Sequence, residues 1–306
     1  MKFNHLEGYE SVTLPTETVN GKRYYVTPSG NKYPSVTTVT GMHNAKWVAK
    51  WRANVGAEKA DKISAQAAGR GSRMGKETAL KPKCFTILHG KRLLDWQIES
   101  LKASGIDEIS IVTGYKTEMF EGNLIKYVNK RWSETNMVAS LFCADKFEGN
   151  TIVSYSDIVY KKDHILKLNK SEADITITAD KKWADLWNLR FENPLDDAET
   201  FKSENEKLIE IGGKTDNISE IEAQYMGLLK LTEKGWKIMF DLFKSLSDLE
   251  KDKTDMTSML NLLLNKGENI NIVFITGGWC EADEYSDILN YEKELKNNKN
   301  WIHDWR

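Results

Sequence analysis

The stretch Ala67-Ala68-Gly69-Arg70-Gly71-Ser72-Arg73-Met74, followed by Lys81-Pro82-Lys83, decides how this chain is interpreted. Its two glycines let the backbone approach phosphate oxygens and turn N–H groups toward them. Arg73 and Lys83 supply positive charge, which suits a triphosphate from which pyrophosphate leaves. A glycine-rich turn after a helix is also a common helix stop. The stretch alone therefore leaves a phosphate loop and a simple helix end both open.

Further motifs follow the stretch in a fixed order. They are Gly90-Lys91, Val112-Thr113-Gly114-Tyr115, Glu134-Thr135-Asn136-Met137, Ser156-Asp157, Thr254-Asp255-Met256-Thr257 and Trp279-Cys280-Glu281-Ala282-Asp283. Together with the G-x-G-x-R and P-K signature, they resemble the nucleotidyltransferases of the sugar-phosphate and phosphocholine type. The resemblance runs over residues 67–306 and implies a nucleotidyltransferase domain there.

The downstream part alternates between predicted strands and helices. Leu94, Ile98 and Leu101 lie at helical spacing and predict a helix over Leu93 to Ala103, followed by a strand over 108–113. Further strands are predicted at 151–155, 174–178 and 270–276, and an amphipathic helix at 233–246. This order predicts an α/β fold, a Rossmann-like three-layer and mostly parallel nucleotidyltransferase sheet with ligands beyond the carboxyl ends of its strands.

One departure from the family concerns the first strand. Family members begin with an apolar strand that runs directly into the glycine loop, whereas residues 60–66 here are polar. Losing a central strand removes about four or five buried aliphatic side chains, or ~6 to 15 kcal/mol. This loss rivals the stability of a whole domain. We therefore expect that residues 36–40 or another run fill the gap, or that the transferase part folds poorly and the geometry of its phosphate loop suffers.

Residues 1–66 have a different character. Two β-rich runs at 23–26 and 32–40 flank the turn 28–31 and predict a hairpin, and 45–66 reads as a helix. Tyr33 to Val39, Trp51-Arg52 and the glycine run resemble the N-terminal fragment of PD-(D/E)XK exonucleases of phage and mitochondrial type. The metal-binding residues of those nucleases do not follow, so no nuclease site is expected. The glycine run fits both patterns, which suggests that two coding sequences were joined there, either by recombination or by sequence assembly.

The charge balance also separates the two parts. Nine Lys/Arg face five Asp/Glu before residue 67, and 34 face 40 after it. The cations of the first part are scattered, which favours a solvated surface over a nucleic-acid patch. A catalytically silent fusion that binds DNA through its first segment is the alternative to the enzyme, and nucleic acid is expected as a partner only there.

Three acidic residues are candidates for one metal site. Asp157 follows a predicted strand, and Glu281 and Asp283 share a face of an extended segment. Hard carboxylate oxygens suit Mg²⁺. An isolated E-x-D is more often a solvated acidic loop, but the family resemblance favours a magnesium site made by all three residues.

The resemblance further implies a reaction. A phosphate or phosphonate oxygen of a small acceptor attacks the α-phosphorus of a nucleoside triphosphate, CMP is the expected transferred group, and pyrophosphate leaves in line. Arg73 and Lys83 are the expected catalytic residues, because they stabilise charge on the leaving group. The expected nucleotide-binding residues are Ala68, Gly69, Gly71, Gly114 and Tyr115, and the expected acceptor-binding residue is Asn136.

Several of these residues have a structural alternative. Tyr115 fits a packing role at a strand end, and Asn136 fits the N-cap of a helix through Met137. Trp183 and Trp187 share a helical face that belongs either to the core or over an acceptor headgroup. The three cysteines show no paired spacing, and no apolar run reaches the length of a membrane span. The sequence therefore predicts a cytoplasmic protein without a membrane partner.

Overall fold

The computed structural model describes residues 16–19, 22–26, 32–34, 74, 80–122, 124–144 and 149–306. The chain divides into two compact units, Met1–Asp61 and Lys62–Arg306. Some of the sequence predictions fall outside the described residues. They are the helix at 45–66, the position of the family's first strand, and the glycine loop with Ala68, Gly69, Gly71 and Arg73.

In the first unit, three short strands form an antiparallel sheet. The strands are β1 (Thr16–Val19), β2 (Lys22–Val26) and β3 (Lys32–Pro34), in the order β1-β2-β3. Tyr25 pairs with Tyr33 across β2 and β3. The predicted hairpin is therefore confirmed in the described residues, and β1 was not predicted. The rest of the predicted second run, residues 35–40, lies outside the described residues.

A six-stranded sheet forms the centre of the second unit. Its order is β11 (Phe201–Glu204), β12 (Lys207–Ile211), β14 (Asn271–Ile275), β10 (Ile175–Asp180), β13 (Gln224–Leu231) and β8 (Thr151–Ser154). Only β10 and β14 run parallel within it. The mostly parallel sheet is therefore a wrong prediction, because β11 and β12 form a hairpin and β13 runs antiparallel to both of its neighbours.

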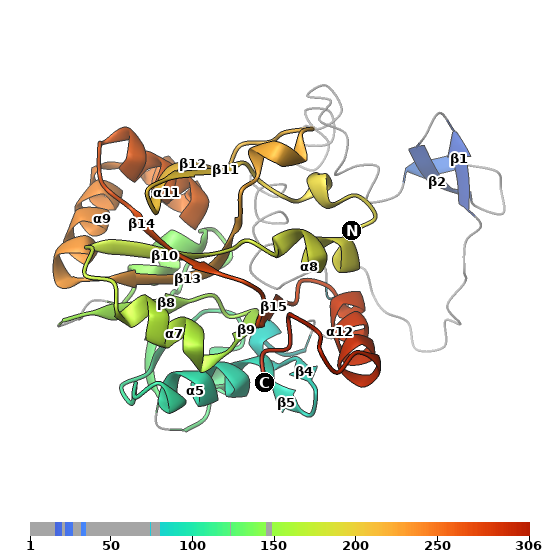
Figure 1. The fold of residues 1–306 in the computed structure, drawn as a ribbon, viewed down its shortest axis with the longest axis horizontal. Coiled ribbons are helices and arrows are strands. Elements are labelled where there is room, and N and C mark those ends of the chain that lie inside the picture. The colour runs from blue at the N-terminus through green and yellow to red at the C-terminus, as the bar shows by residue number, and fades with distance from the viewer. Residues whose placement is uncertain are drawn as a thin grey trace. The chain divides into compact units, whose positions relative to one another are not determined.

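Helices cover the two faces of this sheet and make three layers (Figure 1). Along β10, Ile175, Ile177 and Ala179 belong to one hydrophobic cluster, which also includes residues of α9 (Glu233–Ser245) and α11 (Met256–Asn265). The other cluster includes residues of α7 (Lys162–Asn169), α8 (Trp183–Arg190) and α12 (Tyr285–Asn297). The period of two along a strand sends alternate side chains to opposite layers, so the three-layer α/β architecture agrees with the sequence.

Smaller elements complete the unit. The helices are α5 (Leu93–Ala103), α6 (Met137–Leu141) and α10 (Asp248–Lys253). Three two-stranded sheets pair β4 (Ile87–Leu88) with β5 (Lys91–Arg92), β6 (Ser110–Thr113) with β7 (Ile125–Val128), and β9 (Ile158–Tyr160) with β15 (Trp279–Glu281). The predicted helix at 93–103 is confirmed at both ends, and α9, β6, β8, β10 and β14 begin and end within a few residues of their predicted bounds.

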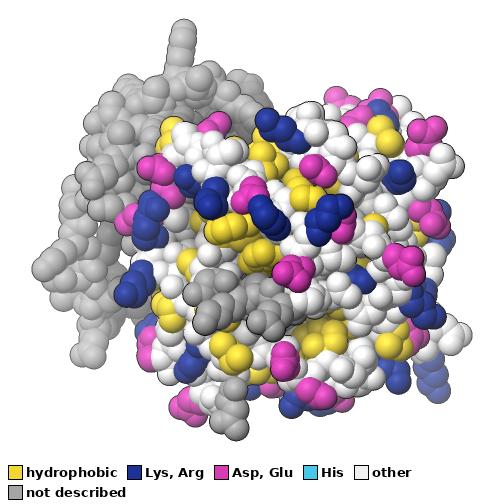
Figure 2. Space-filling view, turned by 90° about the vertical axis from the view of Figure 1, so that its left-hand side faces the viewer, with side chains coloured by type: hydrophobic (Ala, Val, Ile, Leu, Met, Phe, Trp, Pro, Cys, Tyr) yellow, Lys and Arg dark blue, Asp and Glu magenta, His cyan; other side chains and the backbone are white. Residues whose placement is uncertain are grey.

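The surface mixes both signs of charge. Figure 2 shows lysine and arginine side chains interspersed with aspartate and glutamate over the face that carries α9 and α11, in keeping with the net charge of −2. Such a face does not offer a continuous basic track to a polyanion. Among the described residues, no helix has the length and apolar character to span a membrane.

Candidate functional site

The antiparallel pair of β9 and β15 brings two distant parts of the chain together. Glu281 pairs with Ile158, and Trp279 pairs with Tyr160. One residue beyond this ladder, the Ala282 N–H donates to the Asp157 carbonyl at 2.9 Å. The pairing therefore fixes the segment around Asp157 beside residues 281–283, although more than a hundred residues separate them in the sequence.

Three carboxylates gather at this end of the ladder. Oxygens of Asp157, Glu281 and Asp283 lie within 4.8 Å of one another. Ala282 between them is buried, so the two acidic side chains share a face as their spacing predicted. Asp157 Oδ1 is buried without a hydrogen-bond partner. Three hard oxygen donors, one of them unsatisfied, fit a divalent cation such as Mg²⁺.

Lys83 lies against two of these carboxylates. Its Nζ is 2.7 Å from Asp157 Oδ2 and 2.5 Å from Asp283 Oδ1, and the side chain is 14% exposed. Burial opposes the charge on the ammonium, but the carboxylates outweigh burial and hold the pKa of Lys83 above its usual value. Lys83 therefore stays charged, and its position after Pro82 brings the predicted catalytic lysine to the acidic cluster.

Arg190 is a second cation, which the sequence analysis missed. It ends α8 with its side chain only 1% exposed, and its Nη atoms lie 2.8 Å from Glu281 Oε2 and 2.9 Å from Asp283 Oδ2. The guanidinium also stacks on the ring of Trp187, at 5.2 Å from the centroid. A buried arginine that holds two carboxylates fixes their orientation. Its only sequence signal is one charge at the end of a helix rich in tryptophan and leucine.

The start of α12 orients the loop that carries Glu281 and Asp283. Asp287 Oδ2 accepts hydrogen bonds from the N–H groups of Asp283 at 2.8 Å and Glu284 at 2.9 Å. The Tyr291 hydroxyl donates to the Glu281 carbonyl at 2.5 Å. Burial raises the pKa of Glu281 to about 7, while Arg190 acts in the opposite direction. The cluster is therefore held in place by main-chain contacts as well as by ion pairs.

Known proteins are similar to this chain in sequence. A family model described as the MobA-like NTP transferase domain matches residues 66–186. CTP:phosphoglutamine cytidylyltransferase of Campylobacter jejuni is 39% identical over 241 residues, which cover 72% of this chain and 95% of that protein. This chain belongs to the nucleotidyltransferase family. The family predicted from the ordered motifs is thereby confirmed.

Two further relatives of this nucleotidyltransferase are more distant. The 2-aminoethylphosphonate cytidylyltransferase of Lancefieldella rimae is 30% identical over 125 residues, which cover 38% of this chain and 50% of that protein. The structure of the inositol-1-phosphate CTP transferase from T. maritima matches with a TM-score of 0.58 and 18% identity, over 76% of this chain and 94% of that one. The structural match shows the fold alone. The exonuclease-like resemblance of residues 1–66 stays a prediction, and the DNA-binding alternative gains no support from these relatives.

Gly114 and Tyr115 of the nucleotidyltransferase follow β6 and face Trp132. A Cβ added to Gly114 would lie 2.3 Å from the Trp132 Cβ, so close packing requires glycine there. The Tyr115 ring lies 5.3 Å from that of Trp132. These contacts agree with the packing alternative, and the nucleotide-binding roles of both residues stay predictions.

Asn136 is the N-cap of α6. Its Oδ1 accepts from the Met137 N–H at 2.7 Å, and its Nδ2 donates to the Lys253 carbonyl at 3.2 Å. The capping alternative is therefore confirmed, while a contact with the acceptor stays a prediction. Trp183 and Trp187 are buried and belong to the core rather than to an open headgroup site.

Proposed function

We propose that this nucleotidyltransferase transfers CMP from CTP to a phosphorylated or phosphonate small-molecule acceptor and releases pyrophosphate. The observation that carries the proposal is the gathering of Asp157, Glu281 and Asp283 against Lys83. The 39% identity to a CTP:phosphoglutamine cytidylyltransferase supports the choice of base. The acceptor oxygen forms a bond to the α-phosphorus of CTP while the bond from that phosphorus to pyrophosphate breaks.

The three carboxylates would hold the magnesium ion. When bound there, Mg²⁺ supplies charge neutralisation at the phosphate oxygens. Arg190 positions Glu281 and Asp283 through its ion pairs, and the buried Asp157 Oδ1 is left for a ligand. Lys83 and Arg73 would stabilise the negative charge that collects on the leaving pyrophosphate. No covalent intermediate on the protein is needed.

We further propose the remaining substrate contacts and the domain boundary. Residues 67–306 form the transferase domain, and residues 1–66 form a separate exonuclease-like fragment. The nucleotide is bound by Ala68, Gly69, Gly71, Gly114 and Tyr115, and Asn136 faces the acceptor while it caps α6. Removal of backbone N–H donors from the glycine loop would weaken CTP binding, because successive N–H groups form a concave site that binds anions.

A pyrophosphate-release assay tests the proposed reaction. The full chain with Mg²⁺ is mixed with each of the four nucleoside triphosphates and a panel of phosphate and phosphonate monoesters. We expect release with CTP in the presence of at least one acceptor, and loss of release in Asp157→Asn. Asp163→Asn, on the exposed side of α7, is the matched control. Absence of release with every pair of substrates would contradict the proposal.

A further inference from the structure

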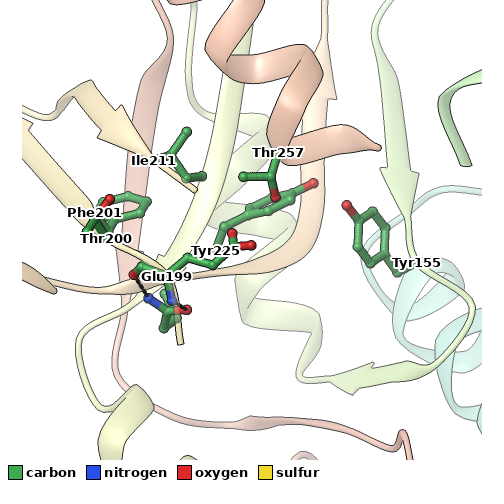
Figure 3. Close-up of a pocket in the computed structure, with 8 residues that line it drawn as sticks. Tyr155, Glu199, Thr200, Phe201, Ile211, Tyr225 and Thr257 are labelled. Carbon is green, nitrogen blue, oxygen red and sulfur yellow. Dashed lines mark hydrogen bonds between the residues drawn. The ribbon is translucent and has the colours of Figure 1, made fainter. Parts of the chain in front are cut away.

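A cavity of about 100 Å³ is lined by Tyr155, which lies two residues before Asp157 of the acidic cluster, and nothing above assigns this cavity a role. It opens between the segment after β8, the edge of β13, the start of β11 and the first turn of α11 (Figure 3). Its lining residues are Tyr155, Glu199, Thr200, Phe201, Ile211, Gln224, Tyr225 and Thr257. The lining combines one carboxylate with hydroxyl groups and aromatic rings.

Glu199 is held rigidly at this cavity. Gln224 Nε2 donates to the Glu199 carbonyl at 2.6 Å, and Gln224 Oε1 accepts from the Glu199 N–H at 3.2 Å. The Gln224 side chain is itself buried, with 6% of the residue exposed. The Glu199 carboxylate also hydrogen bonds with the Thr257 side chain. These bonds fix the backbone and the acidic group together, as a preformed binding site requires.

Two tyrosines form the wall opposite Glu199. The Tyr155 and Tyr225 rings meet edge to face, with centroids 5.8 Å apart, and Figure 3 shows their hydroxyl ends turned toward each other. The Tyr155 N–H donates to the Gly227 carbonyl at 2.9 Å. A Cβ at Gly227 would lie 2.6 Å from the Tyr155 ring, and Gly227 has a φ of +80°. Glycine at this position therefore lets the ring stand where it does.

The charges around the cavity favour a cation. Asp197 and Asp255 add negative potential at Glu199, and Lys214 adds positive potential. The Lys214 ammonium is bound by the carbonyls of Asp197 and Ala198, at 2.8 and 3.2 Å. Around Glu199, two further carboxylates and one lysine therefore contribute to the local charge. Burial raises the pKa of Glu199, and a cation placed against it would restore the charged form.

We propose that this cavity binds a primary ammonium group of the acceptor, with Glu199 as its counter-ion and the tyrosine rings as its walls. The proposal rests on the proposed transfer reaction, because the phosphate end of the same molecule would lie at the acidic cluster. Tyr155 and Asp157 are two residues apart, so their backbones are at most ~7 Å apart. A short acceptor, with its amine a few bonds away from its phosphate, is therefore the first candidate to test. Aromatic rings and a carboxylate together are the usual environment for such a cation.

A matched pair of acceptors tests the proposal. 2-Aminoethyl phosphate and propyl phosphate have similar shapes, but one ends in an ammonium group and the other in a methyl group. We expect the wild-type chain to turn over the amine with a KM about 10- to 100-fold lower, the usual range for one charged hydrogen bond. Glu199→Gln should remove this preference by raising the KM of the amine alone. Thr257→Val should reduce it less, and Glu192→Gln, which changes an exposed neighbour, should leave it intact.

Direct binding separates the cavity from the reaction. Both compounds are titrated calorimetrically into the full chain and into each variant, after urea unfolding has shown that the variants are folded. If Glu199 controls amine binding but no pyrophosphate is ever released, the cavity assignment stands and the transfer reaction falls. If pyrophosphate is released while wild type and Glu199→Gln treat the two compounds alike, the cavity assignment is wrong and the reaction stands.

Discussion

The acidic cluster and the cavity adjoin at Tyr155 and Asp157, yet their charges are balanced in different ways. At the cluster, Lys83 and Arg190 each contact two or more carboxylates within the protein. At the cavity, Glu199 is fixed by an amide and a hydroxyl, and the nearby Lys214 is bound by main-chain carbonyls. The charge of the cluster is therefore balanced by cations of the protein itself, whereas the proposed cation at the cavity comes from the ligand.

Removing Arg190 should break the cluster and leave the cavity intact. Arg190→Met leaves the buried carboxylates of Asp283 and Asp287 and the half-buried Glu281 without their partner, and breaking a buried pair costs about 3 to 5 kcal/mol of unfolding free energy. Urea unfolding measures the loss. Arg131→Met removes exposed ion pairs and should cost less than about 1 kcal/mol. Equal losses in the two variants would show that Arg190 does not support the cluster.

Replacing Lys83 should separate its two expected roles. Lys83→Met should lower kcat/KM by about 10²- to 10³-fold, the usual effect of losing one group that stabilises developing charge. In the absence of nucleotide, the same variant should bind Mn²⁺ more tightly than wild type, because no ammonium occupies Asp157 and Asp283. Calorimetric titration with Mn²⁺ measures this. Lys91→Met, an exposed neighbour on β5, should change neither quantity.

The buried His164, which contacts the residues just before β15, should make the protein less stable at acidic pH. Its Nε2 lies 3.0 and 3.1 Å from the carbonyls of Gly277 and Gly278, and burial lowers the pKa of His164 to about 4. Between pH ~6.5 and the folded-state pKa, His164 binds a proton in the unfolded chain but not in the folded chain. The free energy of unfolding therefore falls by about 2 kcal/mol at pH 5. Urea midpoints at pH 7.5 and pH 5 should differ less in His164→Gln than in wild type. His89→Gln, an exposed histidine, should keep the full difference.

The smallest expected effect separates a cap from a ligand contact. Asn136→Ala should cost about 1 kcal/mol of stability, the usual price of an N-cap, and should loosen the bond from α6 to Lys253 that leads into the cavity wall at Thr257. If Asn136 also contacts the acceptor, the KM of the acceptor rises by tenfold or more. If it only caps α6, that KM stays within about twofold. Steady-state kinetics beside thermal unfolding decide between the two.

Local patterns predicted the helices and the positions of several strands well. The apolar spacing over Leu93 to Ala103 sets a helix whose ends the structure confirms, and the E-x-D spacing placed Glu281 and Asp283 on one face. Strand direction was predicted wrongly, because the alternation of strands and helices hid the hairpin of β11 and β12. Its signal was present at Asn205 and Glu206, two residues with positive φ of 49° and 60° between alternating runs.

The sequence analysis also missed contacts between residues that are far apart in the chain. Arg190 pairs with residues 91 and 93 positions later in the chain, so no local spacing marks it. The cavity escaped notice for the same reason, since Glu199, Tyr155 and Thr257 come from three separate segments of the chain. Periodicity reports how one element meets the core, whereas a site assembled from several elements depends on the topology that joins them.

The ladder between β9 and β15 has a consequence for how the protein folds during its synthesis. Ile158 and Glu281 meet across more than a hundred intervening residues, and contacts of such large sequence separation form late because loop closure must precede them. A nascent chain that has emerged from the ribosome only as far as β14 has the strands of its sheet but lacks two of its three candidate metal-binding carboxylates, Glu281 and Asp283. We therefore expect the ability to bind nucleotide with its metal to appear abruptly once β15 and residues 281–283 have emerged, well after most of the sheet has formed.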